Sequence, residues 1–224
     1  MGELDQIRAR KSYQNAFDQA LKQKIKGSGW RKYWSAVFRK EGDWFFLGEF
    51  SHLFATGRAK MSLGAKPMAL DPILWKMMKI VGNEDQPLSF RYCGAFVCRT
   101  PMFFELETAA DDPANMVNIF VDFCNGKMSE LRTTLGSRPY SELARERNEA
   151  SGFGTFSQTY LMALIHEGRF AEAQAFEGEV GVGFRVISRE PDGETRSFSL
   201  VDAAKQYAQA QTGRRPGAVP LRTR

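Results

Sequence analysis

The sequence has few of the residues on which metal sites and nucleophilic active sites depend. It contains two histidines, His52 and His166, and three cysteines, Cys93, Cys98 and Cys124. Cys93 and Cys98 are five residues apart on a predicted strand, so their side chains point to opposite faces and cannot share a metal ion. The chain also lacks a G-x-S-x-G nucleophile elbow, a phosphate-binding loop with its lysine, and a dinucleotide-binding fingerprint. We therefore expect no cofactor, no metal and three reduced thiols.

Long apolar runs are also absent. No stretch approaches the roughly 18 apolar residues that a transmembrane helix needs. Glu3 and Asp5 stand where a signal peptide would be basic, and no apolar segment follows them. We therefore expect a cytoplasmic protein with no membrane partner.

The net charge of +5 is unevenly distributed along the chain. Residues 1–40 hold ten basic and three acidic residues, and residues 212–224 hold four arginines and no acid. The intervening part is acidic, with 17 basic and 23 acidic residues. Basic ends of this kind can bind nucleic acid or an acidic partner. The alternative interpretation is a solvated helix face and a disordered tail.

Apolar spacing predicts the helices and strands. Tyr13, Phe17, Leu21 and Ile25 recur at every fourth position, which predicts an opening helix with one buried stripe. Short aromatic and β-branched runs around glycine-containing turns then predict strands. The predicted helices cover residues 3–26, 71–81, 112–135 (with a kink or break at Gly126), 137–148, 156–165, 170–176 and 199–211; the predicted strands cover 33–39, 44–53, 58–65, 88–97, 102–108 and 182–187.

Most predicted strands precede most predicted helices, which is typical of an α+β fold. We expect a mostly antiparallel sheet of about five to six strands with helices on one face, and a C-terminal helical region that contains an αα-hairpin turning at Gly168. The expected division is a sheet domain over residues 1–150, a helical appendage on the same body over 151–211, and a disordered basic tail over 212–224.

Three residues are candidates for catalysis. His52 could act as a base, although a histidine on an aromatic strand face is more often a packed side chain. Glu105 and Glu107 share one face of a predicted strand, about 6–7 Å apart, a separation that could suit acid–base work on a glycoside. Alternating glutamates are equally typical of a half-exposed strand.

Five residues near the N-terminus are candidates for contact with a partner: Trp30, Arg31, Lys32, Trp34 and Trp44. Basic side chains attract phosphates, and aromatic faces can stack on unpaired bases. Strand alternation, however, places Arg31 and Lys32 on opposite faces and Trp34 on the face of Ala36 and Phe38. We therefore expect nucleic-acid binding through this segment to be weak and salt-sensitive.

Four parts of the chain stand out together: Gly29–Lys40, Lys66–Trp75, Phe96–Glu107 and the helical pair around Gly168–Ala173. In these parts the chain resembles a bacterial family catalogued as domain of unknown function 4304. The resemblance would span residues 12–178. It implies an α+β fold and no known activity, so it assigns no catalytic residue to this chain.

Three functional hypotheses remain open. The leading one is a non-catalytic module that binds an unknown protein partner, which predicts an exposed apolar patch. The second is a hydrolase-like enzyme, which predicts a deep pocket around His52 or around Glu105 and Glu107. The third is a nucleic-acid binder, which predicts a continuous basic and aromatic face.

Overall fold

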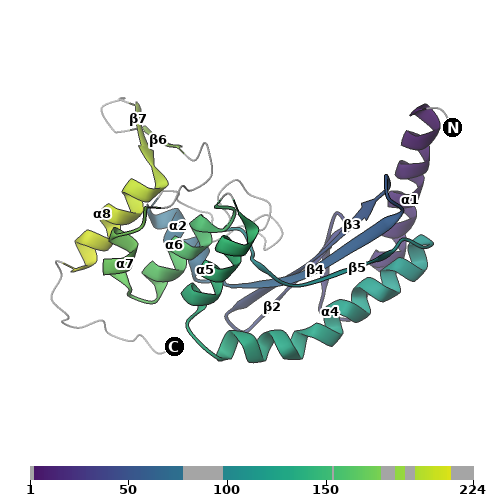
Figure 1. The fold of residues 1–224 in the computed structure, drawn as a ribbon, viewed down its shortest axis with the longest axis horizontal. Helices are drawn as coiled ribbons and strands as arrows, with labels where there is room; N and C mark the ends of the chain where they lie inside the picture. Colours follow the sequence, from purple (N-terminus) through teal and green to yellow (C-terminus); the bar gives the residue numbers. More distant parts are fainter. Residues whose placement is uncertain (1–2, 78–97, 153, 178–184, 190–194, 213–224) are drawn as a thin grey trace. The chain divides into compact units, whose positions relative to one another are not determined.

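The computed structural model describes residues 3–77, 98–152, 154–177, 185–189 and 195–212, which form two compact units (Figure 1). The first unit contains the described residues of 1–68 and 100–139, and the second contains those of 69–77, 98–99 and 140–212. One boundary between the units lies near residue 140, because the helix that follows it packs among the helices of the second unit. The predicted strand 88–97 and the tail 213–224 lie outside the described residues.

The first unit is a sheet with two long helices. In chain order its elements are α1 (Glu3–Lys24), β1 (Arg31–Tyr33), β2 (Ala36–Glu41), β3 (Trp44–Leu53), β4 (Arg58–Pro67), β5 (Met102–Ala109) and α4 (Pro113–Gly136). The strands lie in the order β1-β2-β3-β4-β5, and each neighbouring pair is antiparallel. The predicted α+β fold with an antiparallel sheet is confirmed.

Helices α1 and α4 pack on one face of this sheet. The face includes Phe46, Gly48 and Phe50 of β3, because alternate residues of a strand point the same way. Phe17 of α1 stacks on Phe50 with ring centroids 4.1 Å apart, and Phe120 of α4 lies 5.8 Å from the same ring. The apolar stripe predicted for the opening helix is therefore the stripe that docks on the sheet.

The opposite face carries a second apolar cluster. Ala36, Phe38, Phe45 and Leu47 are buried there, and the Phe38 and Phe45 rings stack with centroids 5.8 Å apart. On β4 this face is solvent-accessible at Arg58 and Lys60 but not further along, where Lys66 is only 1% exposed. The centre of the sheet is therefore apolar on both sides.

The second unit is mainly helical. Its elements are α2 (Leu70–Met77), α5 (Tyr140–Ser151), α6 (Ser157–His166), α7 (Phe170–Gln174), the hairpin of β6 (Arg185–Arg189) and β7 (Thr195–Ser199), and α8 (Leu200–Thr212). Helix α6 contacts α2, α5, α7 and α8. Helices α6 and α7 form the predicted αα-hairpin, and Gly168 adopts a left-handed φ of 73° at the turn. Helix α8 starts close to the predicted residue 199, and its first turn is capped where the Asp202 amide donates to Ser199 Oγ at 3.0 Å.

Three local predictions were wrong. Residues 31–41 form two short strands rather than one, because the chain turns at Trp34 and Ser35. Trp34 therefore does not share a strand face with Ala36 and Phe38. Strand β7 was not predicted, and helix α4 continues through Gly126 instead of breaking there. None of the helices in the described part of the chain has the length and apolar character of a membrane span.

The close approach of α4 to β3 at Gly48 gives a first prediction. A Cβ atom at residue 48 would lie 2.6 Å from Cys124 Sγ and 3.1 Å from Val37 Cγ2. We expect Gly48→Ala to lower the free energy of unfolding by about 1–3 kcal/mol, because the packed helix must shift. Urea denaturation would measure the loss.

Gly126→Ala is the matched control. A Cβ atom there meets no atom within 4 Å, and the residue lies inside a helix. This variant should raise the free energy of unfolding by about 0.5–1 kcal/mol. Equal effects of the two substitutions would contradict the packing described for Gly48.

Candidate anion-binding pocket

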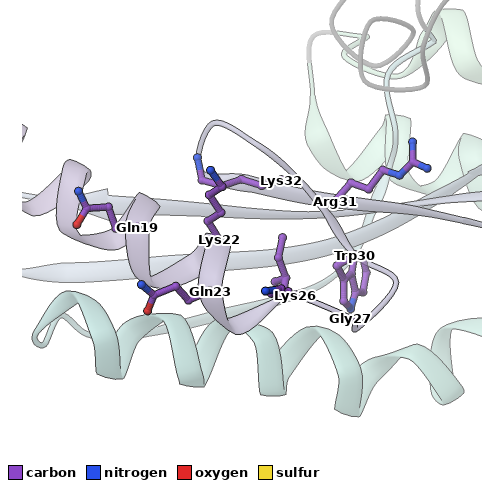
Figure 2. Close-up of a pocket in the computed structure, with 9 residues that line it drawn as sticks. Gln19, Lys22, Gln23, Lys26, Gly27, Trp30, Arg31 and Lys32 are labelled. Atoms are coloured by element: carbon purple, nitrogen blue, oxygen red, sulfur yellow. The ribbon is translucent and has the colours of Figure 1, made fainter.

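An open pocket of about 940 Å³ lies in the first unit, between the C-terminal half of α1 and the start of β1 (Figure 2). Four of its side chains are cationic and two are amides. The lining residues are Gln19, Lys22, Gln23, Ile25, Lys26, Gly27, Trp30, Arg31 and Lys32.

The spacing of residues in α1 explains why its polar side chains line the pocket. Gln19, Lys22, Gln23 and Lys26 recur at intervals of three and four, so they share one flank of the helix. The intervening apolar stripe faces the sheet. Gly27 then adopts a left-handed φ of 79°, which turns the chain back and brings β1 beside the helix. The pocket is the gap between these two segments.

Trp30 is buried beneath the pocket. The residue is 4% exposed, and its Nε1 donates to Asn125 Oδ1 of α4 at 3.0 Å. The Arg39 guanidinium lies 5.5 Å from the centroid of its ring. Trp30 therefore anchors the start of β1 to α4, and its indole ring is not available for stacking by a partner.

The cations around the pocket come from both segments. Lys22 and Lys26 are exposed, and Lys32 Nζ lies 3.1 Å from Asp18 Oδ1, which offsets part of its charge. Arg31 pairs with Phe38 and Lys32 with Val37, so the two basic side chains lie on opposite faces, as the alternation predicted. Figure 2 shows Arg31 extending away from Lys32. The resulting positive field would attract phosphates or carboxylates.

Trp34, unlike Trp30, is exposed to solvent. It occupies the turn between β1 and β2, is 76% exposed, and has a left-handed φ of 50°. Its ring stacks on Tyr33 with centroids 6.0 Å apart and an interplanar angle of 17°. A smaller hollow of about 280 Å³ adjoins the turn and is lined in part by Glu49. Trp44 begins β3 at the other end of the β2–β3 hairpin, so it is not part of this surface.

The structure does not bring the catalytic candidates together. His52 lies on the helix-covered face of β3, between Tyr13 at 4.3 Å and Phe54 at 3.8 Å between ring centroids. Glu105 and Glu107 lie on the other face and form cross-strand ion pairs, Glu105 with Lys60 at 2.9 Å and Glu107 with Arg58. These residues line neither pocket, so a catalytic role finds no support in the geometry.

The two thiols within the described residues are buried. Cys98 lies in the second unit, where its amide donates to Asp71 Oδ1 at 2.9 Å, and Cys124 lies in α4 of the first unit. Burial raises the pKa of Cys124 to about 12. Cys93 lies outside the described residues. The described part of the chain contains no group of three or more histidine, cysteine or acidic side chains that could hold a metal ion.

Comparisons with protein-family models, with curated proteins and with solved structures give no match. The resemblance to the family of domain of unknown function 4304 therefore stays a prediction. The sequence analysis named Trp30, Arg31, Lys32 and Trp34 as candidates for contact with a partner. It did not name Lys22 and Lys26, which line the pocket together with Trp30, Arg31 and Lys32. The signal that could have found them is their spacing along the flank of the predicted helix.

The two tryptophans give a second prediction. Trp30→Phe should lower the free energy of unfolding by about 1–3 kcal/mol, because it removes a hydrogen bond and leaves a cavity. Trp34→Phe should change it by less than about 0.5 kcal/mol, because the ring is exposed. Urea denaturation of both variants tests the assignment, and equal losses would contradict it.

His52 gives a third prediction, on pH. Burial lowers its pKa below the ordinary value near 6.5, and its Nδ1 has no hydrogen-bond partner among the described residues. The unfolded chain therefore binds a proton more readily than the folded chain, so the stability contribution is complete above about pH 6.5 and is lost as the pH falls below it. A positive charge lies close to His52: the Arg10 guanidinium is 5.4 Å from the centroid of the Phe54 ring, which packs against His52.

The measurement is the free energy of unfolding at pH 7.5 and at pH 5.5, for the natural chain and for His52→Phe. The natural chain should lose more stability between the two pH values, because the variant has no imidazole to protonate. Carboxylates titrate in both proteins and cancel in the comparison. Identical losses would show that His52 does not control the pH response.

Proposed function

We propose that this protein is a non-catalytic module that binds a polyanionic macromolecule at the basic pocket of its first unit. The observation that carries the proposal is that Lys22 and Lys26 of α1 and Arg31 and Lys32 of β1 all line one open pocket. Several other basic residues of the unit are paired with carboxylates, as where Arg132 donates to both oxygens of Glu41 at 2.8 and 2.7 Å.

The extent of the basic surface favours a polymer over a small anion. Arg8 and Lys11 are exposed and continue the spacing of Lys22 along the same flank of α1. Fourteen residues separate Arg8 from Lys22, which corresponds to about 21 Å along a helix. A ligand that contacts both ends of this flank must itself be extended.

Charge also favours a polyanion over an apolar protein partner. The large exposed hydrophobic side chains of the described residues come from α1, the β1–β2 turn, β3 and β5; they are Leu4, Ile7, Trp34, Leu53 and Leu106. An interface of ordinary size would need a larger contiguous apolar area. The enzyme hypothesis gains no support from the two pockets described above, since neither is lined by His52, Glu105 or Glu107.

The experiment is titration calorimetry with heparin, a polyanion without bases, at about 0.15 M salt. Lys22→Gln should weaken binding by about 3- to 10-fold, equivalent to roughly 0.7–1.4 kcal/mol. The double variant Lys22→Gln with Lys26→Gln should weaken it further, because each lysine contributes its own attraction.

Lys24→Gln is the matched control. Lys24 carries the same charge on the same helix, but two residues of a helix lie about 200° apart, so it points away from the pocket. This variant should bind heparin within about twofold of the natural chain. Equal losses for Lys22→Gln and Lys24→Gln, or no binding by the natural chain, would overturn the proposal.

A further inference from the structure

We infer that the polyanion is a single-stranded nucleic acid whose unpaired bases stack on Trp34 while its phosphates follow the cations of the basic pocket. This inference rests on the proposed function and adds the class of ligand. Four observations support it: the strain at Trp34, the orientation of its ring, its distance from the cations, and the position of Glu49.

Two features of Trp34 are unfavourable for the stability of the fold. Its φ of 50° lies in the left-handed region, which glycine and asparagine adopt far more readily than a large side chain. Its indole is left largely in water, so it contributes little to a core. Strained residues cluster at binding sites, and this one presents an aromatic surface to solvent.

The ring is already ordered for stacking. Tyr33 supports it from one side in a nearly parallel arrangement. A nucleobase can extend this stack, because every base has a flat π face. Heparin and acidic peptides without aromatic residues offer no comparable surface, and bases within a duplex are already stacked on each other.

The aromatic stack and the cations lie within reach of one ligand. Trp34 follows Lys32 by two residues and Arg31 by three, so at most about 7–10 Å of chain separates it from them. Proteins that bind single strands without sequence preference combine a basic groove with aromatic platforms in this way.

Acidic residues restrict how such a ligand can lie. Glu49 lines the hollow beside Trp34 and would repel a phosphate placed there, so the base rather than the backbone should occupy that end. Asp18 is already engaged by Lys32. The phosphates are therefore expected over Lys22 and Lys26.

The experiment is fluorescence anisotropy with the full chain and three labelled probes at about 0.15 M salt. The probes are an oligothymidine strand of about 12 nucleotides, an abasic strand of equal length, and a duplex of equal length. The oligothymidine strand should bind about tenfold more tightly than either other probe, because it alone offers unpaired bases.

Trp34→Asn should weaken binding of the oligothymidine strand about 5- to 100-fold and leave binding of the abasic strand unchanged. Asparagine tolerates the left-handed turn, so the melting temperature should not fall. Trp34→Tyr, which retains an aromatic ring, should restore most of the affinity. Lys22→Gln should weaken all three probes and reduce the salt dependence of binding.

Equal affinity for the oligothymidine and abasic strands, or a Trp34→Asn variant that binds both as the natural chain does, would overturn the inference. If heparin binding still depended on Lys22 in that case, the proposed function would stand without it. Preference for the duplex would also overturn the inference, since a paired base cannot stack on Trp34.

Discussion

The stacking of Phe17 on Phe50 holds α1 against the sheet, with Phe120 of α4 completing the aromatic contact. Aromatic rings bury large apolar areas, and such stacking adds about 0.5–1.5 kcal/mol beyond the area buried. Once the apolar stripe of α1 is directed towards the sheet, the helical period determines where its other side chains lie. Lys22 is placed beside β1 as a consequence of this docking, so the pocket depends on the core beneath it.

The sheet itself limits where recognition can occur. Phe46 and Gly48 face the helices, while Phe45 and Leu47 belong to the buried cluster on the other side. With both faces apolar at the centre, polar groups that could contact a ligand are confined to edges and ends. The edge at β1 carries cations and an exposed tryptophan, whereas the end at Arg58 carries matched ion pairs.

Much of the fold could be predicted because its signals are local. The stripe of α1, the helix that begins at Asp112 and the cap at Ser199 each depend on residues within a few positions of one another. The turn at Trp34 was missed because its sequence contains none of the glycine, asparagine or proline residues that mark such turns. The continuity of α4 at Gly126 was missed because packing along the rest of the helix outweighs the local cost of one glycine.

The sequence by itself determined the α+β class, most helices, the alternation that separates Arg31 from Lys32, and the scarcity of catalytic side chains. It could not distinguish Trp30 from Trp34, since both stand beside basic residues in the same short segment. Tertiary structure decided between them: Asn125, 95 residues away in the sequence, accepts the Trp30 hydrogen bond, while the turn leaves Trp34 in solvent. The burial of Trp30 and the placement of Lys22 and Arg31 at one pocket depend on contacts between residues far apart in the sequence, which local patterns do not encode.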